Sequence, residues 1–117
     1  MQFQSDKPIY LQIIDLVMEK ILIGEWKVGE KILSVREFAA SVEVNPNTVM
    51  RSYDKLQQDE IIFNKRGLGL FVKENAIKII MNEKKANFLQ HEAPKFFQTA
   101  KLLNIEIDEL IELFKAN

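Results

Sequence analysis

The sequence contains no cysteine and only one histidine, His91. Without cysteine there are no disulfides and no thiolate chemistry, and a lone histidine makes neither a catalytic network nor a metal site. No apolar run approaches the roughly 18 residues that a membrane span needs. The N-terminus lacks the basic segment and apolar stretch of a secretory signal. We therefore expect a cytoplasmic protein that needs no cofactor, binds no metal and does not enter a membrane.

An excess of positive charge is also missing. The chain has 16 Lys and Arg against 17 Asp and Glu, a net charge of −1. Nucleic-acid binding depends on phosphate contacts but needs only one basic face, so the positions of the basic residues matter more than their sum. A phosphate-cradling glycine loop, a nucleophile motif and metal-ligand spacing are all absent from the sequence, which argues against an enzyme.

The first half of the chain carries clear helix signals. Apolar residues at helical spacing predict a helix over 8–23, with Tyr10 in its buried stripe. Ser34, followed three residues later by Glu37, is a capping box that predicts a short helix over 35–41. Asn45 and Pro46 are suited to begin another helix. Two short helices joined by so brief a connection favour a helix-turn-helix.

A β-hairpin is predicted next. Two apolar runs, 61–64 and 70–72, flank a basic turn that contains glycine. Residues 31–33 are compatible with a further short strand. The order of elements is that of a winged helix-turn-helix, so the fold class is mainly α with a small β-hairpin wing (α+β). We assign residues 1–73 to this DNA-binding domain and 74–117 to a tail of two or three helices, in which Pro94 restarts a helix and Asn104 ends one.

Several motifs in this order resemble the GntR family of bacterial regulators: PIYLQI at 8–13, GEKILSVREFA at 29–39, VNPNTV at 44–49 and RGLGLFV at 66–72. The tail, at 88–89, 93–96 and 100–103, is similar to the YtrA-type subfamily with its short helical C-terminal region. The resemblance implies a transcription regulator that binds a double-stranded DNA operator with an inverted repeat as a homodimer. It also implies repression of an operon, such as a transporter operon.

Candidate DNA contacts fall on three parts of the winged helix-turn-helix. The polar face of the second short helix is expected in the major groove, where arginine reads guanine and asparagine reads adenine. The hairpin tip is expected to reach a minor groove. Residues beside the first short helix flank the same surface; capping fully explains two of them, and a phosphate contact is a second role. The set is Ser34, Arg36, Asn45, Asn47, Thr48, Arg51, Lys65, Arg66 and Gly67.

Three residues depart from the pattern that the family resemblance sets. Leu33 stands where proline is usual and Glu60 where glycine is usual, so both bear on loop geometry. Met50 stands where many members have arginine, which bears on the bases that are read. Glu60 is either strained in a left-handed conformation or marks a helix that ends differently.

The tail carries more apolar surface than so short a segment can bury alone, and a symmetric partner is the common solution. The predicted dimerisation residues are Ile77, Ile80, Met81, Phe88, Phe96, Phe97, Leu103, Ile107, Leu110 and Phe114.

One alternative stays open at this level: a winged helix used for protein contacts, without specific DNA binding. That reading predicts basic residues scattered at random, whereas those present lie on the family's DNA-contacting motifs. A salt-dependent binding titration separates the two. The sequence does not identify the operator, the regulated genes or a small-molecule effector.

Overall fold

The computed structural model describes residues 3–4 and 6–117. Two compact units are present, Met1–Met81 and Asn82–Asn117. The division falls after Met81 rather than after residue 73, because the first turns of helix α4 (Ala76–Asn87) belong to the first unit. Ala76 and Ile80 on those turns are fully buried in its core.

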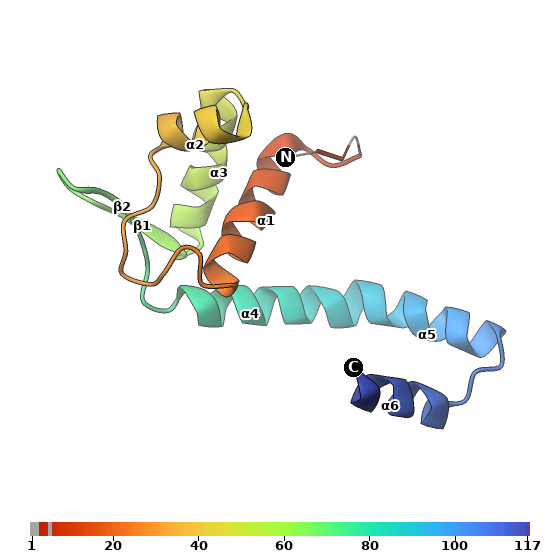
Figure 1. Ribbon diagram of the computed structural model, residues 1–117. Helices are drawn as coiled ribbons and strands as arrows, with labels where there is room; N and C mark the ends of the chain where they lie inside the picture. The colour runs from red at the N-terminus through yellow and green to blue at the C-terminus, as the bar shows by residue number, and fades with distance from the viewer. Residues whose placement is uncertain (1–2, 5) are drawn as a thin grey trace. The chain divides into compact units, whose positions relative to one another are not determined.

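The first unit has the order expected of a winged helix-turn-helix. Three helices, α1 (Ile9–Leu22), α2 (Val35–Val42) and α3 (Pro46–Gln58), precede the strands β1 (Ile62–Lys65) and β2 (Gly69–Val72). Helix α3 packs against both α1 and α2, as Figure 1 shows. The strands form an antiparallel hairpin whose register runs from Ile62 opposite Val72 to Lys65 opposite Gly69.

The core of this unit is built from the apolar faces of its three helices. The stripe of α1 includes Ile13 and Val17, α2 contributes Phe38, and α3 contributes Val49 and Leu56. Each of these side chains is at most 1% exposed. Burying a side chain of this size contributes about 1.5–3 kcal/mol. The helical spacing in the sequence therefore predicted these five inward-facing residues correctly.

Residues 31–33 do not form a strand. The segment makes one isolated bridge to the hairpin, with Lys31 opposite Phe71, and the Ile32 amide donates to the Leu70 carbonyl at 2.9 Å. A longer ladder does not develop because the chain turns at once into the N-cap of α2 at Ser34. The segment instead covers one edge of the hairpin.

The tail consists of the remainder of α4, the π-helical turn η1 (Phe88–Glu92), α5 (Ala93–Leu102) and α6 (Ile107–Ala116). Pro94 lies in the first turn of α5 but does not restart the chain after a break, since residues 76–102 are helical without interruption. Proline lacks an amide hydrogen and its ring crowds the preceding turn. The turn before Pro94 is correspondingly wider: the Ala93 amide donates to the Phe88 carbonyl, five residues back, as in a π-helix. Asn104 ends α5 with a φ of 57°, as predicted.

Within residues 3–4 and 6–117, no helix is both long enough and apolar enough to cross a membrane.

Candidate nucleic-acid interface

Helix α2 begins at a complete capping box. The Glu37 amide donates to Ser34 Oγ at 3.1 Å, and the Ser34 amide donates to Glu37 Oε1 at 2.9 Å. The hydrogen bond from the Ser34 backbone, followed by that with its side chain, lowers the pKa of the Glu37 carboxyl. Ser34 is thus occupied as a cap, as the sequence predicted, and it remains exposed at the surface.

Helix α3 presents its N-terminal end to solvent. Asn45 Oδ1 accepts the Asn47 amide at 2.8 Å, and Pro46 occupies the first turn. Asn47 and Arg51 are exposed, while Thr48 is half-buried. The buried face of the same helix carries Val49, Ser52, Tyr53 and Leu56. The polar face predicted from the sequence is therefore the solvent-facing side of α3.

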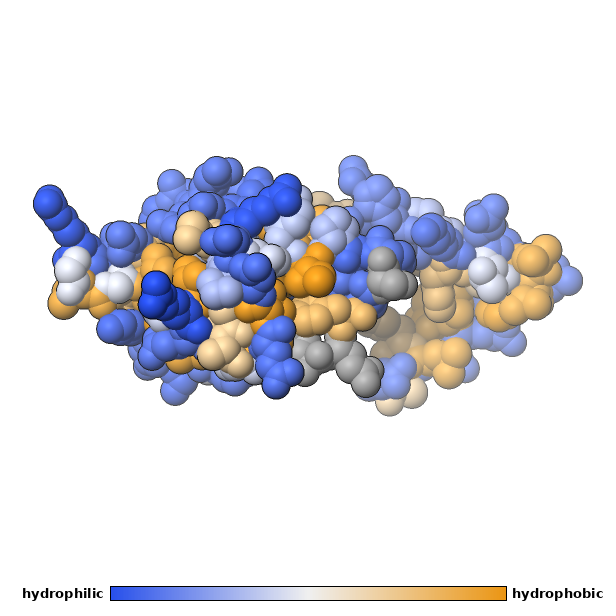
Figure 2. Space-filling view, turned by 90° about the horizontal axis from the view of Figure 1, so that it is seen from above, coloured by the Kyte–Doolittle hydropathy of each residue, from blue (hydrophilic) through white to orange (hydrophobic). Residues whose placement is uncertain are grey.

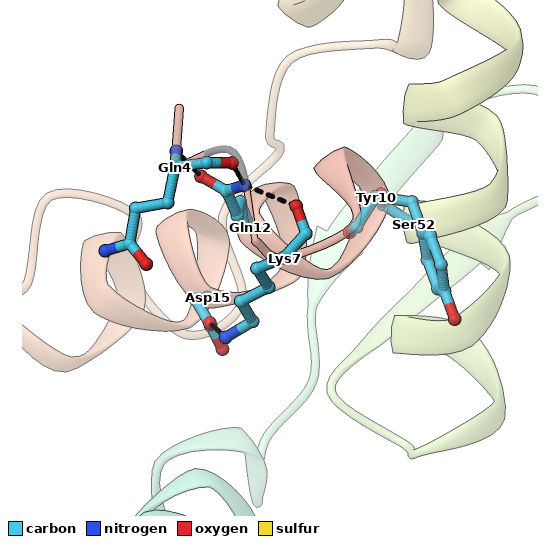
Figure 3. A network of polar contacts seen from close by, with 6 residues as sticks. All are labelled: Gln4, Lys7, Tyr10, Gln12, Asp15 and Ser52. Carbon is cyan, nitrogen blue, oxygen red and sulfur yellow. Dashed lines mark hydrogen bonds and ion pairs between the residues drawn. The ribbon is translucent and has the colours of Figure 1, made fainter. Parts of the chain in front are cut away.

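Two buried hydroxyl groups fasten α3 to the rest of the unit. Tyr53 Oη donates to the Leu33 carbonyl at 2.9 Å, and burial raises the pKa of this phenol strongly. Ser52 Oγ donates to the Tyr10 carbonyl at 2.7 Å, which links α3 to the first turn of α1 (Figure 3). Because each bond joins α3 to a different segment, the exposed face of α3 is held in a fixed orientation.

Tyr10 is a residue whose role the sequence reading missed. Helical spacing predicts Tyr10 in the buried stripe of α1, but its side chain is half-buried and the Arg51 guanidinium lies 3.7 Å from the centre of its ring. Such a cation–π contact contributes about 0.5–1 kcal/mol at an exposed site. The contact uses the flat face of the Arg51 guanidinium and so orients the side chain. The N–H groups at the edge of the guanidinium point away from the ring face and can meet a base or phosphate. The sequence signal for this partial exposure was a tyrosine at the end of an apolar stripe, since the polar hydroxyl of its ring favours contact with solvent.

The N-terminal end of α1 has a polar network of its own. The Gln12 side-chain amide accepts from the Gln4 amide and donates to the Gln4 carbonyl, both at 2.8 Å, and donates to the Lys7 carbonyl at 2.7 Å. Lys7 also forms an ion pair with Asp15 (Figure 3). These bonds fix the segment before α1 and satisfy a buried amide.

The wing places basic side chains at an exposed turn. Gly67 and Gly69 have φ values of 79° and 111°, which side chains with a Cβ rarely adopt. Lys65 and Arg66 are exposed beside them, and Lys65 Nζ lies 5.1 Å from the centre of the Phe71 ring.

An open groove of about 390 Å³ runs between the wing and the start of α2, and both Ser34 and Gly67 line it. The structure therefore brings these two predicted DNA contacts to one groove. Arg36 is exposed on α2 and is not among the residues that line this groove.

The exposed face of α3 also carries residues outside the predicted set of DNA contacts. Among them, Met50 lies between the predicted contacts and Asp54 beyond them, with Met50 at 48% exposure. In the part of the chain that the structure describes, no group of three His, Asp or Glu side chains is placed to hold a metal ion.

The predicted dimerisation residues fall into three groups by their exposure in the single chain. Ile80 is fully buried in the core of the first unit, so assigning it to a dimer interface was wrong; its position one turn from exposed Ile77 and beside exposed Met81 concealed this. Leu110 is half-buried. All the others are exposed: Ile77, Met81, Phe88, Phe96, Phe97, Leu103, Ile107 and Phe114.

A capped pair of short helices followed by a basic hairpin defines a winged helix-turn-helix protein, the class of fold that places its second short helix in DNA. The profile described as "Bacterial regulatory proteins, gntR family" matches residues 9–72. The chain belongs to the GntR family of bacterial transcription regulators, and within it to the YtrA type.

Individual relatives agree with this assignment. The chain is 37% identical to the HTH-type transcriptional repressor YtrA of Bacillus subtilis over 96% of this chain and 85% of that protein. A GntR-family regulator from Bacteroides thetaiotaomicron matches with a TM-score of 0.78 and 42% identity, over 93% and 95% of the two chains. BusR of S. agalactiae, solved in complex with its busAB-promoter DNA, matches with a TM-score of 0.59 and 25% identity, over 93% of this chain and 54% of that one.

Proposed function

We propose that the protein is a homodimeric repressor that binds an inverted-repeat operator, with α3 of each copy in the major groove and each wing beside it. The observation that carries this proposal is the exposed face of α3, where Asn47 and Arg51 stand at the surface while capping and hydrogen bonds fix the helix beneath them. A rigid helix with exposed amide and guanidinium groups suits the reading of base edges.

The basic wing supports contact with the DNA backbone. Lys65 and Arg66 are exposed at a tip whose glycines allow close approach of the main chain. Each phosphate that such residues neutralise makes binding more dependent on salt. The similarity to BusR, which was solved with promoter DNA, supports the same mode of use.

The composition of the C-terminal unit supports a dimer. Of residues 82–117, only Ala93 and Ala100 are buried. The large apolar side chains of the unit stand at its surface, seen as orange atoms toward the right of Figure 2. Large apolar side chains gathered at a surface are typical of a protein interface. A symmetric contact with a second copy would cover them on both chains at once.

Repression is proposed because the chain is similar over nearly its whole length to a protein named as a repressor. A dimer whose two α3 helices occupy adjacent major grooves covers about two helical turns of DNA. Bound within a promoter, such a complex competes with the transcription machinery for the same duplex. A transporter operon is the proposed target class.

The test begins with in vitro selection from random duplexes, followed by fluorescence anisotropy on the enriched sequence. We expect an inverted repeat with half-sites about 10 base pairs, or a multiple, apart. Binding should weaken linearly with the logarithm of salt concentration. Failure to enrich any sequence would favour the protein-interaction alternative. Enrichment of one unrepeated half-site by a monomer would refute the dimeric arrangement.

A further inference from the structure

Met50 is an apolar residue on the solvent-facing side of α3, outside the face that the helix buries. The helix buries Val49, Ser52, Tyr53 and Leu56, and Met50 is outside that face with 48% of its surface exposed. It stands one turn after Asn47 and one turn before Asp54, both exposed. The surface that is otherwise suited to hydrogen bonding therefore contains one long, flexible, apolar side chain.

The thioether of methionine is at best a weak acceptor and has no donor. Of the groups that the four bases expose in the major groove, the C5-methyl of thymine is the one recognised by apolar contact; guanine, adenine and cytosine are recognised there through hydrogen bonds. Methionine is unbranched and adapts to irregular surfaces, so it can cover such a methyl from a range of approach angles.

The neighbouring residue Arg51 is directed to a different side of α3 from Met50. Its guanidinium lies over the Tyr10 ring at 3.7 Å, on the side of α3 that Ser52 ties to α1. Tyr53, on the other side of the buried face, is tied to the loop before α2 through Leu33. Met50 lies toward this second side by helical position, so Met50 and Arg51 leave the helix toward different sides.

We propose that Met50 is a specificity-determining residue that reads a thymine methyl in each half-site of the operator. This inference rests on the proposed function and names one base contact within it. A contact of this kind favours thymine over cytosine at one position of the half-site without any hydrogen bond.

The experiment uses the full-length protein and the operator enriched by selection. Each thymine of one half-site is replaced in turn by deoxyuridine, which keeps the base pair and removes only the C5-methyl. For wild type we expect one replacement to weaken binding about fourfold, the effect of withdrawing one methyl from apolar contact. The same replacement should change the affinity of Met50→Ala by less than about twofold, within ordinary context dependence.

Two variants control for changes in the DNA and in the helix. Met50→Leu keeps an apolar side chain and should remain sensitive to the same deoxyuridine. Met50→Arg should select guanine where wild type selects thymine, because arginine pairs with the guanine edge. All three variants change an exposed residue, so their thermal midpoints should stay close to that of wild type.

The outcomes separate the inference from the proposed function. Specific binding with equal deoxyuridine effects on wild type and Met50→Ala, or an enriched half-site without thymine, overturns the role of Met50 and leaves operator binding intact. No enriched sequence at all overturns both. A loss confined to one thymine in wild type and Met50→Leu, and absent in Met50→Ala, supports the assignment.

Discussion

Helix α3 ends in a hydrogen-bonded turn that normally favours glycine, but the residue there is Glu60. The Ile61 amide donates to the Leu56 carbonyl at 3.0 Å, and the Glu60 amide donates to the Gln57 carbonyl at 3.1 Å. This pair of bonds is the Schellman motif, and its left-handed position has a φ of 63° at Glu60. The left-handed conformation inferred as one alternative from the sequence is thus present.

A left-handed residue also ends three other helices, which gives an internal comparison. Gly24 after α1 has a φ of 81°, Glu43 after α2 has a φ of 56°, and Asn104 after α5 has a φ of 57°. Each is followed by an amide that reaches back to the last turn. Glycine and asparagine are the residues that tolerate this conformation best. Glu60 and Glu43 are therefore the two strained members of the four.

The prediction compares Glu60→Gly with Glu60→Ala. Both variants remove the exposed ion pair between Glu60 and Lys73, so that contribution cancels. The Cβ costs about 1–2 kcal/mol in the left-handed region, and the greater freedom of unfolded glycine offsets roughly 0.4–1 kcal/mol. Glu60→Gly should be the more stable by about 1 kcal/mol, or about 4 °C in thermal midpoint for a chain of this length.

Circular-dichroism melts at one fixed protein concentration measure this difference, since a dimer's midpoint depends on concentration. Asp54, exposed within α3, supplies the control: there Asp54→Ala should exceed Asp54→Gly in stability by about 1 kcal/mol, because glycine is unfavourable inside a helix. If Glu60→Ala is as stable as Glu60→Gly, the strain assigned to Glu60 is absent. Operator affinity should be the same in both variants, because the residue lies at the end of α3 opposite its N-terminus.

Three further predictions concern the cap, the DNA contacts and the tail. Because the pKa of Glu37 is lowered from 4.5 in the folded protein, the stability that its charge provides is present above that value and lost as the pH falls below it; in urea denaturation, the wild-type advantage over Glu37→Gln should therefore disappear in acid, and an advantage independent of pH would contradict this. Arg51→Ala should weaken operator binding by about 1–3 kcal/mol more than binding to random DNA, whereas Lys65→Ala should weaken both alike and lower the salt slope by about 0.9; equal losses for Arg51→Ala in anisotropy titrations would make it a phosphate contact only. Phe114→Asp, at a side chain 83% exposed in the single chain, should sediment as a monomer at concentrations where wild type is a dimer, and an unchanged dimer would remove Phe114 from the interface.

Local signals in the sequence were sufficient for the starts of α2 and α3 and for the wing. The capping box at Ser34, the cap at Asn45 and the glycines of the hairpin turn each act within a few residues, so their patterns are legible without the fold. Together with the motif order, they also gave the fold class and the family. The predicted roles of the DNA-contacting residues remain predictions that binding measurements decide.

Other features depended on contacts between segments distant in sequence. Helical periodicity grouped Ile80 with Ile77 and Met81, but only packing against the first unit's core decides which of the three is buried. Likewise, Tyr10 and Arg51 are 41 positions apart, and their stacking exists because α1 and α3 pack together. The sequence by itself determined where α2, α3 and the wing begin and which faces are apolar, since these follow from short-range hydrogen bonding and periodicity. The tertiary structure decided which apolar residues are satisfied within the chain, because burial is a property of the neighbours that folding brings together.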